Sequence, residues 1–241
     1  MKTKSFFLLL MLLFISLNGY SQLFKKVVGN DKYITKEYKV DDFVKVNISN
    51  AFNVIYKVNP DSAGVIKVYG EENILDLISI KSEKGTLSMK LKGAIDPEFG
   101  VILIHMYSKN LVAVRNEGSG TFEIQSPIES AEIKFNISGS GQIKAEDIKC
   151  GVVDVNLGGS GDFYAKGSAG FASYSLQGSG EIRCFDLNAE TSNISITGSG
   201  AVKCSVSKEL KSFLTGSGKI YYKGEPEIKS RTIGTGQLVK M

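Results

Sequence analysis

Six acidic side chains in the second half of the chain are candidates for chemistry. Glycoside hydrolysis needs two carboxyl groups, one acting as a general acid and the other as a base or nucleophile. Measured from the nearest Gly-Ser-Gly tripeptide, the six lie at different offsets, so we expect no stacked pair or triad and no catalytic residues. The candidates are Glu123, Asp147, Asp154, Asp162, Glu181 and Asp186.

Other reactive side chains are few. His105 is the only histidine and lies in an alternating strand pattern, which indicates an ordinary strand residue. Asp162 follows a glycine-rich segment, but the consecutive copies that a calcium-binding repeat needs are absent. Cys184 and Cys204 share one inward offset from the glycines, which predicts small core residues, and with Cys150 they make an odd number. We therefore expect no metal, no cofactor and no disulfide framework.

A Gly-Ser-Gly tripeptide recurs seven times, as Gly-Thr-Gly in the last copy, in steps of 18 to 21 residues. A period near 20 over this many copies is typical of a solenoid. A phosphate-binding loop would require a helix after the glycines, and alternating strand-like residues follow instead. The glycines are Gly118 and Gly120, Gly139 and Gly141, Gly159 and Gly161, Gly178 and Gly180, Gly198 and Gly200, Gly216 and Gly218, and Gly234 and Gly236.

Apolar residues hold fixed positions on both sides of each tripeptide. The position two residues after the second glycine holds Phe122, Ile143, Phe163, Ile182, Val202, Ile220 and Leu238. This period-2 pattern indicates strands with one buried face. The sequence therefore predicts an all-β fold, a right-handed parallel β-helix of about 20-residue rungs. The alternation places both glycines of each tripeptide inward, at a corner without room for a Cβ atom, and the serine outward.

One predicted outward row combines charged and aromatic side chains. The third residue after each second glycine is, in order, Glu123, Lys144, Tyr164, Arg183, Lys203 and Tyr221. A basic and aromatic stripe of this kind could contact acidic or neutral glycan through charge and ring stacking. The alternative is an ordinary solvated face, since all these residue types are common on exposed strands.

The chain divides into four predicted parts. Residues 1–21 are expected to be a signal peptide, because Lys2 and Lys4 precede a short apolar run that ends before Ser21. That run is too short to span a membrane, and no later segment reaches the necessary length. Residues 22–39 are expected to be a linker, residues 40–117 an N-terminal cap with the first coils, and residues 118–241 the regular solenoid.

The cap is less regular than the repeats but related to them. Ile48–Val54 aligns with Ile137–Ile143, with its apolar positions in register, and is predicted to be a first coil without the glycines. The remainder is predicted as a strand at 65–69, a helical turn at 72–78, a hairpin at 80–91 turning at 83–85, and a strand at 101–106. Such a cap would stop edge-to-edge growth.

Charge excludes one class of partner. After removal of the signal lysines, 27 basic and 25 acidic residues remain. A net charge near +2 does not give the dominant positive field that a nucleic-acid-binding protein needs.

Several segments together resemble the head GIN domain family, described as putative auto-transporter adhesins. They are the export signal, Asn-Ala-Phe-Asn-Val at 50–54, Gly-Glu-Glu-Asn-Ile-Leu at 70–75, Lys-Gly-Thr-Leu-Ser-Met at 84–89 and the serial Gly-Ser-Gly rungs. The resemblance covers roughly residues 40–225 and implies a β-helical bacterial envelope or surface protein without catalytic residues.

The expected function is that of a non-catalytic envelope module. It would be exported to the periplasm, the outer surface or the medium of a Gram-negative-type bacterium, where it would bind glycan or a cell-surface protein by adhesion or scaffolding. The alternative is a carbohydrate-active enzyme, a polysaccharide lyase or hydrolase, built on a β-helix.

Overall fold

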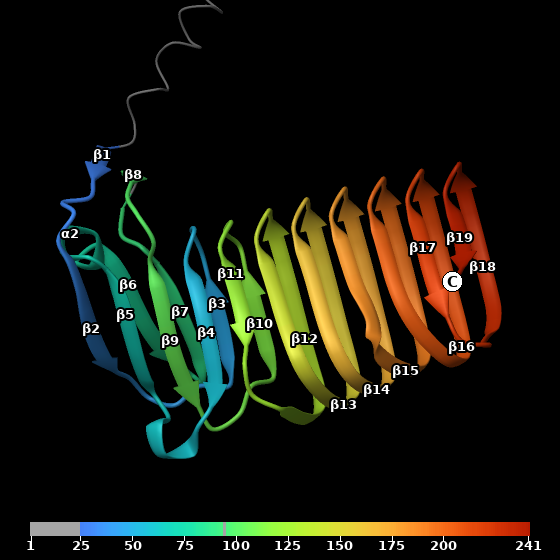
Figure 1. Cartoon of the computed structure of the whole chain (residues 1–241), viewed down its shortest axis with the longest axis horizontal. Helices are drawn as coiled ribbons and strands as arrows, with labels where there is room; N and C mark the ends of the chain where they lie inside the picture. Colours follow the sequence, from blue (N-terminus) through green and yellow to red (C-terminus); the bar gives the residue numbers. More distant parts are fainter. Residues whose placement is uncertain (1–24, 94) are drawn as a thin grey trace, which may run out of the picture.

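The computed structural model describes residues 25–93 and 95–241, in which strands predominate. Seventeen strands join into one sheet that follows the long axis of the molecule (Figure 1). Two further strands, β1 (Lys25–Val28) and β8 (Ile95–Glu98), pair in parallel as a separate sheet. The predicted signal peptide lies outside the described residues. Within them, no helix has the length and apolar character needed to cross a membrane.

Long parallel strands form the regular part, and from β13 onward each runs from one glycine tripeptide to the next. They are β12 (Ile128–Gly139), β13 (Gln142–Gly159), β14 (Asp162–Gly178), β15 (Glu181–Gly198) and β16 (Ala201–Gly216). Each pairs with the next in parallel, and Phe163 aligns with Ile143 before it and Ile182 after it. The predicted β-solenoid is confirmed.

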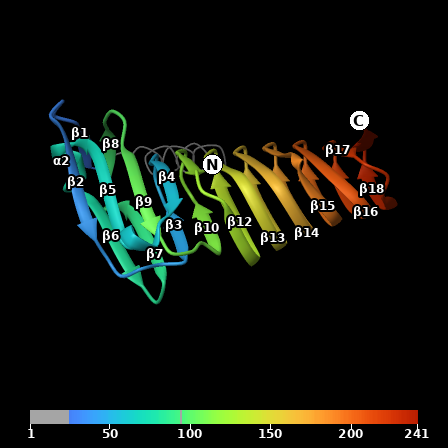
Figure 2. The ribbon, with the colours of Figure 1, turned by 60° about the horizontal axis from the view of Figure 1, so that its bottom comes forward.

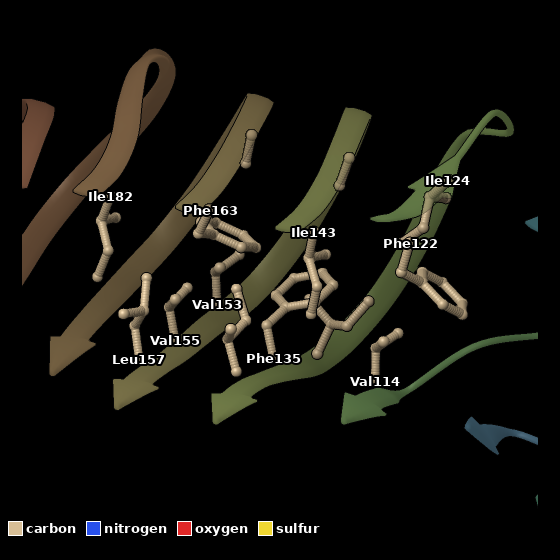
Figure 3. Close-up of a cluster of buried hydrophobic side chains, with 14 of the residues drawn as sticks. Val114, Phe122, Ile124, Phe135, Ile143, Val153, Val155, Leu157, Phe163 and Ile182 are labelled. Carbon is tan, nitrogen blue, oxygen red and sulfur yellow. The ribbon is translucent and has the colours of Figure 1, made fainter. Parts of the chain in front are cut away.

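The core is a set of apolar rows that run through the coils. Alternate residues of every long strand are buried, and the labelled side chains in Figure 3 point into the space between the strands. Phe135, Phe163 and Ile182 are completely buried, and the rings of Phe135 and Phe163 lie 4.9 Å apart. Each coil adds a similar amount of buried apolar area to every row. Because burial stabilises the fold by about 25 cal/mol per Å² of apolar area, the stability of the solenoid grows with each coil.

The glycine tripeptides form the corners. The second glycine is buried in every copy but the last, and a Cβ atom on Gly180 or Gly200 would lie 2.4 Å from the carbonyl oxygen of the second glycine one coil earlier. The first glycine does not face inward as predicted: it is exposed or half-exposed, and from Gly139 onward its φ lies between +109° and +127°. This backbone conformation turns the chain, so strand alternation does not continue through the corner.

Hydrogen bonds link each corner to the one before it. The N–H groups of Ser160 and Gly161 both donate to the Gly139 carbonyl at 3.0 Å, and the later corners repeat this arrangement. The central serines are exposed, as predicted.

The predicted first coil is present. It consists of β3 (Lys45–Ile48) and β4 (Asn53–Val58), and the second coil consists of β10 (Ala113–Asn116) and β11 (Thr121–Ile124). Val54 aligns with Phe122, which aligns with Ile143. Asn50 occupies the position of the first glycine with a φ of +74°, which asparagine tolerates better than most residues. Its side chain also accepts a hydrogen bond from the Leu91 N–H group at 3.0 Å.

The cap contains antiparallel pairs, which the coils lack. Its elements are β2 (Tyr33–Lys39), η1 (Pro60–Ser62), β5 (Val65–Glu71), α2 (Glu72–Leu75), β6 (Ile78–Glu83), β7 (Thr86–Leu91) and β9 (Leu103–Ser108). β6 and β7 form the predicted hairpin, and β5 pairs antiparallel with both β2 and β9. In Figure 2 these strands gather at one end of the molecule.

The prediction that residues 22–39 form a linker was wrong. This segment contains β1 and β2, and every residue of β2 pairs with β5. β2 is only half-buried on its inner side, so its apolar signal is weak, and its partner lies about 30 residues away in sequence.

The last coil differs from the others inside. It consists of β17 (Lys219–Lys223), β18 (Glu227–Gly234) and β19 (Gln237–Lys240). Thr232 aligns with the buried Leu214, and Lys240 aligns with Tyr222. Polar residues therefore occupy two inward positions where earlier coils carry apolar ones, whereas Ile228 and Leu238 continue the apolar rows of Leu210 and Ile220.

Candidate functional site

The structure places the predicted stripe residues in one row. Each is the direct strand partner of the next, from β11 through β13, β14, β15 and β16 to β17. We call this row the outer stripe: Glu123, Lys144, Tyr164, Arg183, Lys203 and Tyr221. Lys144 and Arg183 are exposed, and the other four are half-buried.

Carboxylates neutralise the centre of the outer stripe. Glu181 accepts a hydrogen bond from Arg183 Nε at 2.7 Å, and its second oxygen lies 2.7 Å from Lys203 Nζ. Arg183 also reaches Asp162, at 3.4 Å. Burial alone would raise the pKa of Glu181, but the hydrogen bonds from Lys203 and Arg183 bring the pKa below its ordinary value. Glu181 is therefore ionised at neutral pH, which is the opposite of what a general acid requires.

The expectation that no two of the six carboxylates stack was wrong for one pair. Asp162 and Glu181 are direct strand partners, because each immediately follows the second glycine of its corner. Comparing this offset between repeats could have revealed the pair from sequence alone. Glu123 and Asp186 accept hydrogen bonds from neighbouring side chains, Gln125 in the first case and Tyr164 in the second. Asp154 accepts one from Asn156, and Asp147 is exposed.

The C-terminal half of the outer stripe borders a hollow. A depression of about 550 Å³ is lined by Phe185, Lys203 and Tyr221, with Ser179, Ser199 and Met241 around them. A second one, of about 540 Å³, lies on the other side of Phe185. The ammonium group of Lys223 sits 4.6 Å from the centre of the Phe185 ring. Rings, hydroxyls and charges together suit a sugar or a peptide, and sequence analysis did not identify Phe185.

The remaining reactive side chains do not converge on the outer stripe. His105 lies in β9, between Ile55 of β4 and Lys67 of β5. Cys184 and Cys204 are direct strand partners in the core, as predicted for small core residues, and burial raises the pKa of each thiol to about 12. Among the described residues, no three His, Cys, Asp or Glu side chains come together to hold a metal ion.

Comparison with known proteins gives one family and several solved structures. A family model described as "Putative auto-transporter adhesin, head GIN domain" matches residues 42–226. A putative adhesin from Bacteroides fragilis is 26% identical, over 89% of this chain and 100% of the other, with a TM-score of 0.84. A protein from Parabacteroides distasonis, titled a putative lipid binding protein, is 27% identical over 90% and 100% of the two chains, with a TM-score of 0.77. A putative adhesin from Parabacteroides merdae is 25% identical over 90% and 99%, with a TM-score of 0.69. No curated protein matches the chain.

Proposed function

The chain belongs to the family described as putative auto-transporter adhesin, head GIN domain, and from this premise we propose that it is an exported, non-catalytic binding module of a bacterial envelope. It acts by adhesion or scaffolding, in the periplasm, at the outer surface or outside the cell of a Gram-negative-type bacterium. Its ligand is a glycan or a cell-surface protein.

One observation carries this proposal: outward side chains repeat in register on consecutive coils. In the outer stripe, Lys144, Tyr164 and Arg183 occupy equivalent positions on neighbouring strands, which lie about 4.8 Å apart. An extended ligand laid along the solenoid would meet a side chain at every coil. The hollow beside Lys203 and Tyr221 adds a local depression for one part of that ligand.

The paired carboxylates favour one alternative, a carbohydrate-active enzyme. Asp162 and Glu181 are close enough to share the Arg183 guanidinium. Against catalysis, the pKa of Glu181 is held below its ordinary value by its two basic neighbours, whereas a glycosidase acid has a raised pKa.

Charge reversal tests the outer stripe. We expect the triple variant Lys144→Glu, Arg183→Glu, Lys203→Glu to lose binding to bacterial cells and to an acidic polysaccharide, measured by pull-down and calorimetry. Wild-type binding should also weaken as salt is raised, because exposed charges are screened over about 8 Å at physiological ionic strength. Binding that survives both treatments would exclude the stripe as the contact surface.

A matched control changes the same total charge elsewhere. Lys90, Lys149 and Lys208 are exposed and lie off the outer stripe, and their triple reversal should leave binding intact. Equal losses in both variants would indicate a general charge effect. Polysaccharide cleavage by the wild type that is abolished in Asp162→Asn, Glu181→Gln would instead establish the enzyme.

A further inference from the structure

A second outward face carries hydroxyl and amide side chains where the outer stripe carries charges. It lies on the strand segments that lead into the glycine corners of β12 to β16 and continues on β18. One row runs through Asn136, Asn156, Ser175, Ser195, Phe213 and Arg231, each aligned with the next. The row beside it runs through Ser138, Gly158, Gln177, Thr197, Thr215 and Ile233. From β12 to β16, neither row contains an ionisable residue.

These polar groups are available to a ligand. In the part of the chain that the structure describes, the side chains of Asn136, Ser175, Gln177 and Ser195 make no hydrogen bond to another protein group. Their donors and acceptors meet only solvent, so a ligand that replaces that water would form new hydrogen bonds without breaking any within the protein.

The face is hollowed along the solenoid axis. One depression of about 310 Å³ is lined by Ser173, Ser195 and Phe213 among others, and a second, of about 170 Å³, by Asn136 and Gln177 among others. Both are lined in part by Ser175, so they lie next to each other on this face, and together we call them the polar groove. Its depth arises because serines on β14 and β15 are short, whereas Phe213 on the next coil stands up as a wall.

Phe213 is the aromatic side chain of the polar groove. It is 40% exposed, and the guanidinium of Arg231 lies 6.0 Å from its ring centre. The cation attracts the ring, and Phe213 lines the depression together with Ser195 of the preceding coil. Sugar rings carry an apolar C–H face that stacks on such a surface, while their hydroxyls bind amides and serines.

Most charges at the border of the polar groove are paired with an opposite charge. Lys211 contacts Glu209 at 3.2 Å, Lys229 contacts Glu209 at 2.8 Å and Glu227 at 3.2 Å, and Arg115 at the other end contacts Glu117 at 2.9 Å. Exposed pairs of this kind add little to stability, but they weaken the local potential that would attract an acidic ligand.

We propose that the polar groove binds a neutral, extended glycan, with Phe213 stacking on one sugar and the side chains of successive coils binding the hydroxyls of others. This inference rests on the proposed function and names its ligand class and a surface distinct from the outer stripe. The strand spacing of about 4.8 Å is close to the length of one sugar unit in an extended chain, so equivalent groups recur once per unit.

The test uses the full chain and a panel of linear neutral hexasaccharides of glucose, mannose and xylose, with polygalacturonate as the acidic comparison. We expect binding to at least one neutral probe, with little dependence on salt. Phe213→Ala should weaken that binding about tenfold or more, as removal of a central aromatic anchor does. Ser195→Tyr should block the groove and give a similar loss, and the melting temperature of each variant shows that it folds.

Tyr69→Ala is the matched control. Tyr69 is also an exposed ring, 42% exposed, but it lies in β5 of the cap, away from both the polar groove and the outer stripe, so this variant should bind the neutral probe normally. Neutral binding that is unchanged in Phe213→Ala and Ser195→Tyr, or that is lost equally in Tyr69→Ala, would overturn the polar groove while leaving the proposed function standing. Binding only to polygalacturonate, or cell binding that protease treatment of the cells removes, would also overturn it. Failure to bind cells and every glycan would contradict the proposed function itself.

Discussion

Gly139 and Gly198, each the first glycine of its tripeptide, allow the stability cost of a side chain at a corner to be divided into backbone strain and close contact. Gly139 and Gly198 have nearly the same φ, +125° and +127°. A Cβ atom on Gly139 would lie 3.3 Å from the nearest carbonyl oxygen, whereas one on Gly198 would lie 2.4 Å from the Gly178 carbonyl. Alanine at either site therefore meets the same backbone strain, but alanine at 198 must displace the backbone of the neighbouring coil much further than alanine at 139.

The expected magnitudes follow from these two effects. An unfavourable backbone conformation costs about 1–3 kcal/mol, which is the loss expected for Gly139→Ala. Gly198→Ala adds the displacement of a hydrogen-bonded carbonyl, comparable to overpacking a core at about 1–3 kcal/mol. The gain from restricting the unfolded chain is equal at both sites and cancels in the difference. Ser199→Ala, at the exposed centre of the same corner, should change stability by less than about 0.5 kcal/mol.

Thermal unfolding followed by circular dichroism, together with guanidinium titration, measures these differences. For a chain of this size each kcal/mol shifts the melting temperature by about 2–4 °C. Gly198→Ala should therefore melt several degrees below Gly139→Ala, and both should melt below Ser199→Ala. Equal melting of the two glycine variants would refute the role of close coil contact, and an equal loss in Ser199→Ala would make the serine the structural element.

Three further predictions address the core, the thiols and the central carboxylate. Phe163→Asp should unfold the solenoid because it buries an unpaired charge, whereas Thr197→Asp, on the exposed face, should melt like the wild type; a folded Phe163→Asp would contradict the inward assignment. Burial raises the pKa of the Cys184 and Cys204 thiols to about 12, so neither should react with a thiol reagent at pH 8 until guanidinium is added, and rapid labelling of the native protein would show that the core opens. Burial raises the pKa of Glu181, but its basic partners lower it by more, so the pKa in the folded protein lies below the ordinary value. The stabilising effect of Glu181 is therefore present above the ordinary glutamate pKa of about 4.3 and is lost as pH falls through the folded pKa. Glu181→Gln should destabilise the fold at pH 7 but little at pH 3, and an equal effect at both pH values would disprove this linkage.

The repeat made most of the fold predictable. Because the glycines mark each corner, the distance from a glycine gives every residue its position in the coil, and the outer stripe and the core row through Phe163 and Ile182 follow directly. The first coil was also predictable despite lacking glycine, since Asn50 and Val54 keep the spacing of the later copies.

Features that depend on contacts outside the repeat were not predictable. β2 was expected to be part of a linker because its partner β5 lies outside any periodic pattern. The polar groove arises from the sizes of side chains on neighbouring coils, Ser175 and Ser195 beside Phe213, rather than from a motif. The pairing of Arg183 with Glu181 could have been predicted from the sequence, but only by also comparing the residues that flank the outer stripe in each repeat.

Polar side chains in β18 and β19 make that edge of the sheet a poor template for another strand. A parallel solenoid presents open strand edges, and a wholly apolar cross-section there would be a surface on which a second chain could continue the stack. Here Ser230, Thr232 and Lys240 follow inward rows with groups that favour water over another coil, whereas Ile228 and Leu238 keep their rows apolar. At the opposite end the antiparallel β2–β5 pair replaces the parallel coils. The broad side faces, more than these two edges, are therefore the places where other molecules can attach.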